Sequence, residues 1–209
     1  MRNNQQIRLQ NNNGNTKKKE RIGTTLRREN KLIWILCLFV GISMIIYSAS
    51  DIYMEKQYTK DAEKRAADLL EAYESETTNA DIIGTLEIPD LELKLAILSI
   101  SSEKNLDTSI CKFSGPDIGE IGHLVIAGKH YQGGILFGGL GFLSEGSEII
   151  LTTREGESFY YEVYDKETVT ANDKAALSQY QGKRGLTLFS AATLDSDRLL
   201  VRCQEKTNR

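Results

Sequence analysis

The sequence predicts an all-β domain, a barrel or a sandwich, preceded by a membrane helix and a helical stalk. Short segments of alternating apolar and polar residues recur from residue 82 onward, few helical patterns interrupt them, and a long run without a charge precedes them. The chain has 209 residues, which suits one domain with flanking segments. The predicted boundaries are a basic tail over 1–31, a transmembrane helix over 32–50, a stalk over 51–81, the β domain over 82–203 and a C-terminal tail over 204–209.

Residues 32–50 form the run without a charge, LIWILCLFVGISMIIYSAS. At about 1.5 Å per residue a helix of this length approaches the roughly 30 Å hydrocarbon core of a bilayer, so we expect one transmembrane helix. The small residues 48–50 leave a cleaved signal peptide as the alternative. The long apolar run and the long preceding tail favour retention of the helix.

Charge indicates how the chain lies in the membrane. Residues 1–31 hold nine Lys or Arg and two Glu, a net charge of +7, so the tail is predicted to be cytoplasmic and the C-terminal domain extracellular. The whole chain carries −3, which leaves −10 for the remainder. An acidic exported domain excludes nucleic acid as a partner, and the basic tail is expected to contact anionic membrane lipid.

The segments on either side of the apolar run differ in character. The tail before it is rich in Asn, Gln, Lys and Arg and is predicted to be disordered. From Asp51 to about Glu76 helix formers carry a narrow apolar stripe, which predicts a stalk helix that packs one face on the domain. The stripe consists of Ala66, Ala67, Leu69, Leu70 and Tyr73.

Seven strands are predicted from alternation and turn residues. They cover residues 83–89, 91–97, 123–127, 148–153, 158–169, 185–190 and 198–203. Residues 154–157 (REGE) form the predicted turn of a hairpin. Of the three cysteines, Cys37 lies in the membrane run, and Cys111 and Cys203 are both exported and could form a disulfide, although their spacing matches no recognised pattern.

Five short motifs occur in a fixed order, and together they resemble the sortase family. They are IGTLEIP (83–89), FSGP (113–116), GHLVIAG (122–128), LTLFS (186–190) and RLLVR (198–202). The resemblance covers roughly residues 82–203. It implies a sortase-like eight-stranded β-barrel with short helices, on the outer face of a Gram-positive cell membrane, with a groove for an LPxTG-like sorting signal and no cofactor or metal.

In the family a cysteine attacks the signal, a histidine transfers protons and an arginine stabilises the oxyanion. Here Ala191 occupies the nucleophile position, and its methyl group cannot attack a carbonyl. Lys129 occupies the histidine position, and the adjacent His130 is a possible displaced acid or base if a bulge turns it into the groove. Arg198 matches the family arginine; it is expected to line the groove, with pairing to Asp195 or Asp197 as the alternative.

Parity along the strands sorts the remaining candidates, because successive side chains point to opposite faces. Ser190 and Cys203 should face away from the groove, which argues against either as a substitute nucleophile. Arg202 should share the face of Arg198 unless a bulge intervenes, and His123 is expected on the barrel surface.

The sequence thus predicts a membrane-anchored sortase-family protein that is catalytically inactive. Its predicted partners are sorting-signal peptides, pilins or another sortase at the cell surface. One alternative is an active transpeptidase of the cysteine type that uses displaced groups, or whose cysteine was replaced by engineering. The other alternative is a structural surface-assembly barrel with no ligand in the groove.

Overall fold

A computed structural model describes residues 3–78, 80–131, 133–170, 183–191 and 197–206. Two compact units divide the chain, Met1–Glu55 and Lys56–Arg209. The first unit is helical, and the second holds every strand of the described chain.

Helix α1 spans Asn3–Glu74 and contains the apolar run. Ile33–Ser50, with a mean hydropathy of 2.1, is the one segment of the described chain that is long and apolar enough to cross a membrane. This is consistent with the predicted membrane anchor. The tail predicted to be disordered is helical from Asn3 onward in this structure, and it contains no proline that would interrupt the helix.

Residues 56–74 of α1 form the stalk segment, which belongs to the second unit. It packs on the barrel through an apolar stripe, as expected, although Ala67 is exposed and Ala62 is buried instead. Leu69, Leu70 and Tyr73 contact a cluster of buried strand residues, which we call the stalk-side cluster. Its members are Ile82, Ala96, Leu98 and Cys111.

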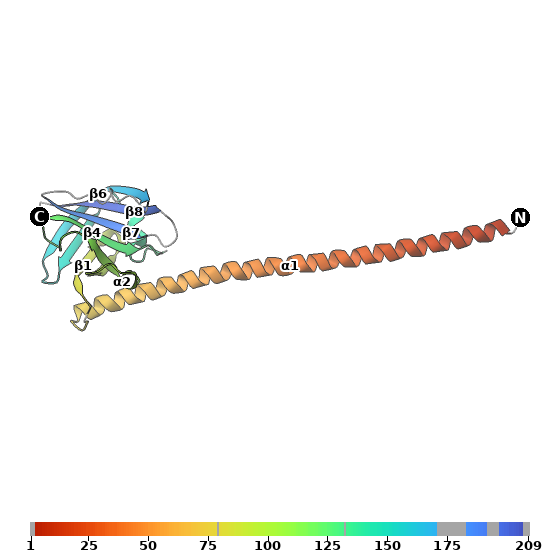
Figure 1. The fold of residues 1–209 in the computed structure, drawn as a ribbon, viewed down its shortest axis with the longest axis horizontal. Coiled ribbons are helices and arrows are strands. Elements are labelled where there is room, and N and C mark those ends of the chain that lie inside the picture. The colour runs from red at the N-terminus through yellow and green to blue at the C-terminus, as the bar shows by residue number, and fades with distance from the viewer. Residues whose placement is uncertain (1–2, 79, 132, 171–182, 192–196, 207–209) are drawn as a thin grey trace. The chain divides into compact units, whose positions relative to one another are not determined.

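The strands close into an eight-stranded barrel with short helices, as the sequence predicts, in the order β1-β2-β3-β4-β7-β8-β6-β5. Figure 1 shows β4, β7 and β8 together in one wall. Neighbouring strands are antiparallel except for β2–β3 and β4–β7. The strands are β1 Ile82–Ile88, β2 Leu93–Leu98, β3 Ile110–Ser114, β4 Gly122–Lys129, β5 Glu148–Thr153, β6 Ser158–Thr170, β7 Arg184–Ala191 and β8 Asp197–Glu205. The short helices are η1 Pro89–Leu91, α2 Glu103–Leu106 and η2 Phe137–Phe142.

The observed strands differ from the expected ones by up to two residues at an end, and one observed strand was not expected. β3 was not predicted, because it has only five residues and opens on two successive apolar ones, which leaves too short an alternating pattern. β8 extends two residues past the predicted end at Cys203, since Gln204 and Glu205 continue its ladder with β6.

Alternation along β4, β7 and β8 gives this wall two apolar faces. The inner face contributes to the main core through Leu124, Ile126, Leu186, Leu188, Val201 and Cys203. The outer face carries a second buried cluster, which we call the outer cluster. Its members are Val125, Ala127, Val169, Phe189 and Leu200. A sheet wall that buries apolar residues on both faces is suited to hold a site on its outer side.

Candidate functional site

The strand register brings Lys129, Ala191 and Arg198, the three residues expected at the catalytic positions of the family, to one end of the wall. Lys129 of β4 pairs with Ala191 of β7, and Phe189 pairs with Leu200 of β8. Extending the antiparallel register by two residues places Ala191 opposite Arg198. The side chain of Ala191 lies outside the described part of the structure, so its position rests on the backbone register.

Lys129 is engaged by a carboxylate. Its Nζ donates to Oδ1 of Asp107, which follows α2, and the Lys129 side chain is only 18% exposed. An ammonium group carries donors and no acceptor, so in this arrangement Lys129 has no lone pair with which to take a proton. Lys129 is therefore a paired cation at the position that the sequence predicts for the family histidine.

His130 lies one residue beyond the end of β4 and is exposed. The β4–β7 register runs without a shift from Gly122 to Lys129, so the bulge that would turn His130 into the site is absent from this strand pair. His130 instead forms an isolated bridge with Leu136. Its backbone is thus directed to the loop after β4.

Arg198 is part of an aromatic stack on the outer face. Its guanidinium carbon lies 5.1 Å from the ring centroid of Phe189, a distance typical of a cation–π contact. The ring of Phe189 lies 5.6 Å from that of Phe113 and is tilted by 48°. The alternative partners Asp195 and Asp197 have side chains outside the described residues. Phe189 therefore holds Arg198 at the edge of the outer cluster.

The substitute nucleophiles are buried away from this face. Ser190 is buried, and alternation directs it inward, opposite to Phe189. Cys203 lies in the main core, where burial raises its pKa, and burial under the stalk segment raises the pKa of Cys111 to about 11. All three cysteines are free, so Cys111 and Cys203 form no disulfide in this structure. Thiols with raised pKa values are poor nucleophiles.

His123 is not on the open surface where the sequence placed it. It points to the outer side but is only 4% exposed, and its Nε2 lies 2.8 Å from the hydroxyl of Thr187. Burial lowers its pKa, and the nearby charge of Arg202 lowers it further. Alternation correctly indicated the face, but it cannot show that neighbouring side chains cover a residue on that face.

Arg202 follows the same face as Arg198, at the register position opposite Thr187. Its guanidinium binds two carboxylates of β6, at 2.5 Å from Asp165 and 2.7 Å from Glu167. These two ion pairs fasten β8 to β6. Arg202 therefore has a structural role next to the site and is occupied by its own partners.

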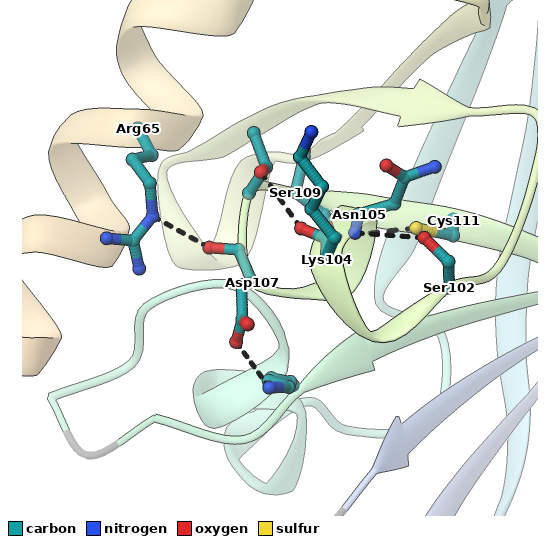
Figure 2. Close-up of polar contacts among 9 residues, drawn as sticks. Arg65, Ser102, Lys104, Asn105, Asp107, Ser109 and Cys111 are labelled. Atoms are coloured by element: carbon teal, nitrogen blue, oxygen red, sulfur yellow. Dashed lines mark hydrogen bonds and ion pairs between the residues drawn. The ribbon is translucent and has the colours of Figure 1, made fainter.

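Asp107 is the residue of this site that the sequence did not reveal. It lies 22 positions before Lys129, and no local pattern links the two. Only the fold, which places α2 beside the end of β4, brings the carboxylate to the ammonium. Arg65 of the stalk segment reaches the same residue, and Figure 2 shows it directed at the backbone oxygen of Asp107.

Comparison with known proteins shows the family to which the chain belongs. The protein-family model of the sortase domain matches residues 86–206, which is more than half of the chain. The chain therefore belongs to the sortase family. Sortase A of Bacillus anthracis is 29% identical over 128 residues, a match that spans 61% of this chain and 60% of that relative.

Solved structures share the fold. Listeria monocytogenes sortase A is similar with a TM-score of 0.56 and 18% identity, over 61% of this chain and 88% of that one. Streptococcus pneumoniae sortase C gives a TM-score of 0.56 and 25% identity, over 61% and 68% of the two chains.

Proposed function

We propose that this protein is a catalytically inactive member of the sortase family that binds sorting-signal peptides or pilins, or a working sortase, at the cell surface. The observation that carries the proposal is the pairing of Lys129 with Ala191 in the β4–β7 register. The two positions of the family's thiol and imidazole are adjacent, and neither group is present.

The loss of covalent chemistry follows from the residues themselves. A methyl side chain at position 191 has no lone pair, and removing the nucleophile of a protease costs on the order of a millionfold in rate. The ammonium of Lys129 is bound to Asp107 and has no acceptor to offer. Retention of Arg198 alone supplies a donor for a carbonyl or carboxylate but no step of bond formation.

The capacity to bind a peptide is supported by the outer face. Arg198 and the half-exposed ring of Phe113 both contact the buried ring of Phe189, a member of the outer cluster. Capture of an extended peptide depends on apolar pockets and hydrogen bonds, which do not require a nucleophile. The S. pneumoniae sortase C has been described in terms of its pilin substrate specificity, which favours a partner of that kind here.

The proposed location is a cell membrane with the barrel outside. The apolar helix over Ile33–Ser50 supports a single-pass anchor, and the charge of +7 over residues 1–31 supports a cytoplasmic N-terminus. A binding protein held at this surface would meet exported proteins that carry sorting signals.

The test measures cleavage and binding of LPxTG-like fluorogenic peptides by the full chain in detergent micelles. Four proteins are compared: the wild type, Lys129→His, Ala191→Cys and the double variant. We expect the wild type and the Lys129→His variant to bind without cleaving, and the double variant to cleave. Ala191→Cys alone should remain nearly silent, because the paired ammonium cannot accept a proton.

Three outcomes would contradict the proposal. Cleavage by the wild type would show an active enzyme with a displaced nucleophile. Absence of both cleavage and binding in all four proteins would favour a structural barrel. Binding that survives Arg198→Ala together with Phe113→Ala unchanged would place the peptide site elsewhere.

A further inference from the structure

The single-turn helix α2 is fixed firmly between the stalk segment and the outer face of the barrel. The hydroxyl of its N-cap Ser102 accepts a hydrogen bond from the backbone N–H of Asn105 at 3.2 Å. The side-chain amide of Asn105 donates to the carbonyl of Ile100 at 2.9 Å. After the helix, the hydroxyl of Ser109 donates to the carbonyl of Ala96 in β2 at 2.7 Å. The first two bonds brace the start of α2 locally, and the third ties the segment that follows α2 to β2.

Apolar packing links α2 to both clusters of the barrel exterior. Leu106, the last residue of the helix, packs against the outer cluster and also against the stalk-side cluster. The stalk-side cluster is the one that Leu69, Leu70 and Tyr73 of the stalk segment cover. A displacement of the stalk segment would therefore alter the packing of Leu106, and through Leu106 the packing of the outer cluster.

Polar contacts follow the same route through Asp107. The backbone oxygen of Asp107 accepts a hydrogen bond from Nε of Arg65 at 2.9 Å, and its carboxylate binds Nζ of Lys129. Figure 2 shows these two groups of Asp107 pointing in different directions, one toward α1 and the other away from it. One residue thus connects the stalk segment with the end of β4, using two separate atoms.

We propose that Arg65 and Asp107 are positioning residues that hold Lys129 at the end of β4, and that the stalk segment is therefore part of the site. The part of this proposal that concerns peptide affinity rests on the proposed function. The part that concerns the order of the β4 end does not. In this arrangement the stalk sets the position of a cation beside Ala191, in addition to linking the barrel to the apolar helix.

The chain supplies a matched control. Lys94 of β2 forms an ion pair with Glu74 at 2.6 Å, so it also fastens the stalk segment to the barrel. Both of these side chains are about half exposed, and the bond between them involves neither α2 nor Lys129. Loss of the Lys94 pair weakens stalk docking without passing through Asp107.

The test uses the full chain in detergent micelles with variants Arg65→Ala, Asp107→Asn, Asp107→Glu and Lys94→Ala. Asp107→Asn removes the anion that binds Lys129 and keeps the backbone oxygen that Arg65 binds. Arg65→Ala removes the hydrogen bond to that backbone oxygen and keeps the anion. Hydrogen exchange is measured for peptides that cover the end of β4 and the stalk segment. Affinity for an LPxTG-like peptide is measured in parallel.

We expect Arg65→Ala and Asp107→Asn each to raise the rate of hydrogen exchange at the end of β4 about two- to fivefold, which corresponds to the loss of a partly exposed polar contact. The affinity for the peptide should fall by a similar factor. Asp107→Glu should recover part of the loss, and Lys94→Ala should raise exchange in the stalk alone. Arg65→Lys serves as a second variant if Arg65→Ala fails to fold.

Unchanged exchange at the end of β4 in Arg65→Ala would overturn the proposal, as would equal effects of Lys94→Ala and Arg65→Ala at that end. If these variants show faster exchange at the end of β4 but the wild type binds no peptide, the connection from Arg65 through Asp107 to Lys129 would be upheld. The proposed function would then be refuted instead.

Discussion

Replacement of Phe189 by leucine tests whether the aromatic stack organises the site. The ring of Phe189 is 5% exposed and contacts two partners, the ring of Phe113 at 5.6 Å and the guanidinium of Arg198 at 5.1 Å. Leucine keeps an apolar side chain in the pocket and removes both ring contacts. The substitution therefore isolates the stack from simple burial.

The expected cost can be worked out from these contacts. An aromatic pair contributes about 0.5–1.5 kcal/mol beyond burial, and a cation–π contact at a partly exposed site contributes about 0.5–1 kcal/mol. The Phe189→Leu variant should thus lose about 1–2.5 kcal/mol of the free energy of unfolding. Because Arg198 also loses its support, peptide affinity should fall about fivefold, the equivalent of roughly 1 kcal/mol.

Phe159→Leu is the matched control, since Arg184 lies 5.3 Å from the ring of Phe159. Loss of this contact should cost about 0.5–1 kcal/mol of stability and leave peptide binding unchanged. Urea unfolding of the chain from Asp51 onward and fluorescence polarisation with labelled peptide provide the two measurements. Equal losses of affinity in both variants, or a stability change below about 0.3 kcal/mol for Phe189→Leu, would refute this reasoning.

Further predictions concern packing, pH and thiol reactivity. Gly128→Ala should lower the free energy of unfolding by about 1–3 kcal/mol in urea titration, because its Cβ would lie 2.7 Å from the ring of Phe137. The pKa of His123 is lowered in the folded state, so the unfolded chain binds the extra proton first as the pH falls. The stability contribution should therefore be full above about pH 6.5 and decrease below that pH. The variant His123→Gln should show a smaller decrease when thermal melts at about pH 5 and about pH 8 are compared. In a Cys37→Ser background, Cys111 and Cys203 should react with a thiol reagent at pH 8 only as fast as the protein unfolds, and rapid labelling of the native protein would contradict their burial.

Most of the barrel could be predicted because most of its strands show the alternation of apolar and polar residues in their own sequence. β5 matches its predicted residues 148–153, and the turn that follows it contains Gly156 with a φ of +88°, a conformation that glycine adopts without strain. Parity along β8 gave the correct face for Cys203, which lies in the main core. Local sequence determines these features, and local sequence was sufficient to find them.

The site was less accessible to sequence reasoning because its contacts are long-range. Asp107 meets Lys129 only after α2 folds against β4, and the one-turn helix itself is too short to show a helical period. His123 was assigned to the surface because alternation gives the face of a residue and not its cover. Both failures have one cause: the relevant neighbours are distant in the chain.

Lys129 and Ala191 are better understood as one change than as two. An imidazole at position 129 serves to move a proton for a thiol, and with a methyl group at position 191 no such proton exists. Position 129 is then under no requirement to titrate near neutral pH, and a lysine can form a permanent ion pair there with Asp107. The pair ties the end of β4 to α2, and through Arg65 to the stalk segment. The polar contacts at the end of β4 thus serve structure, as the proposed role of a site that binds and does not react requires.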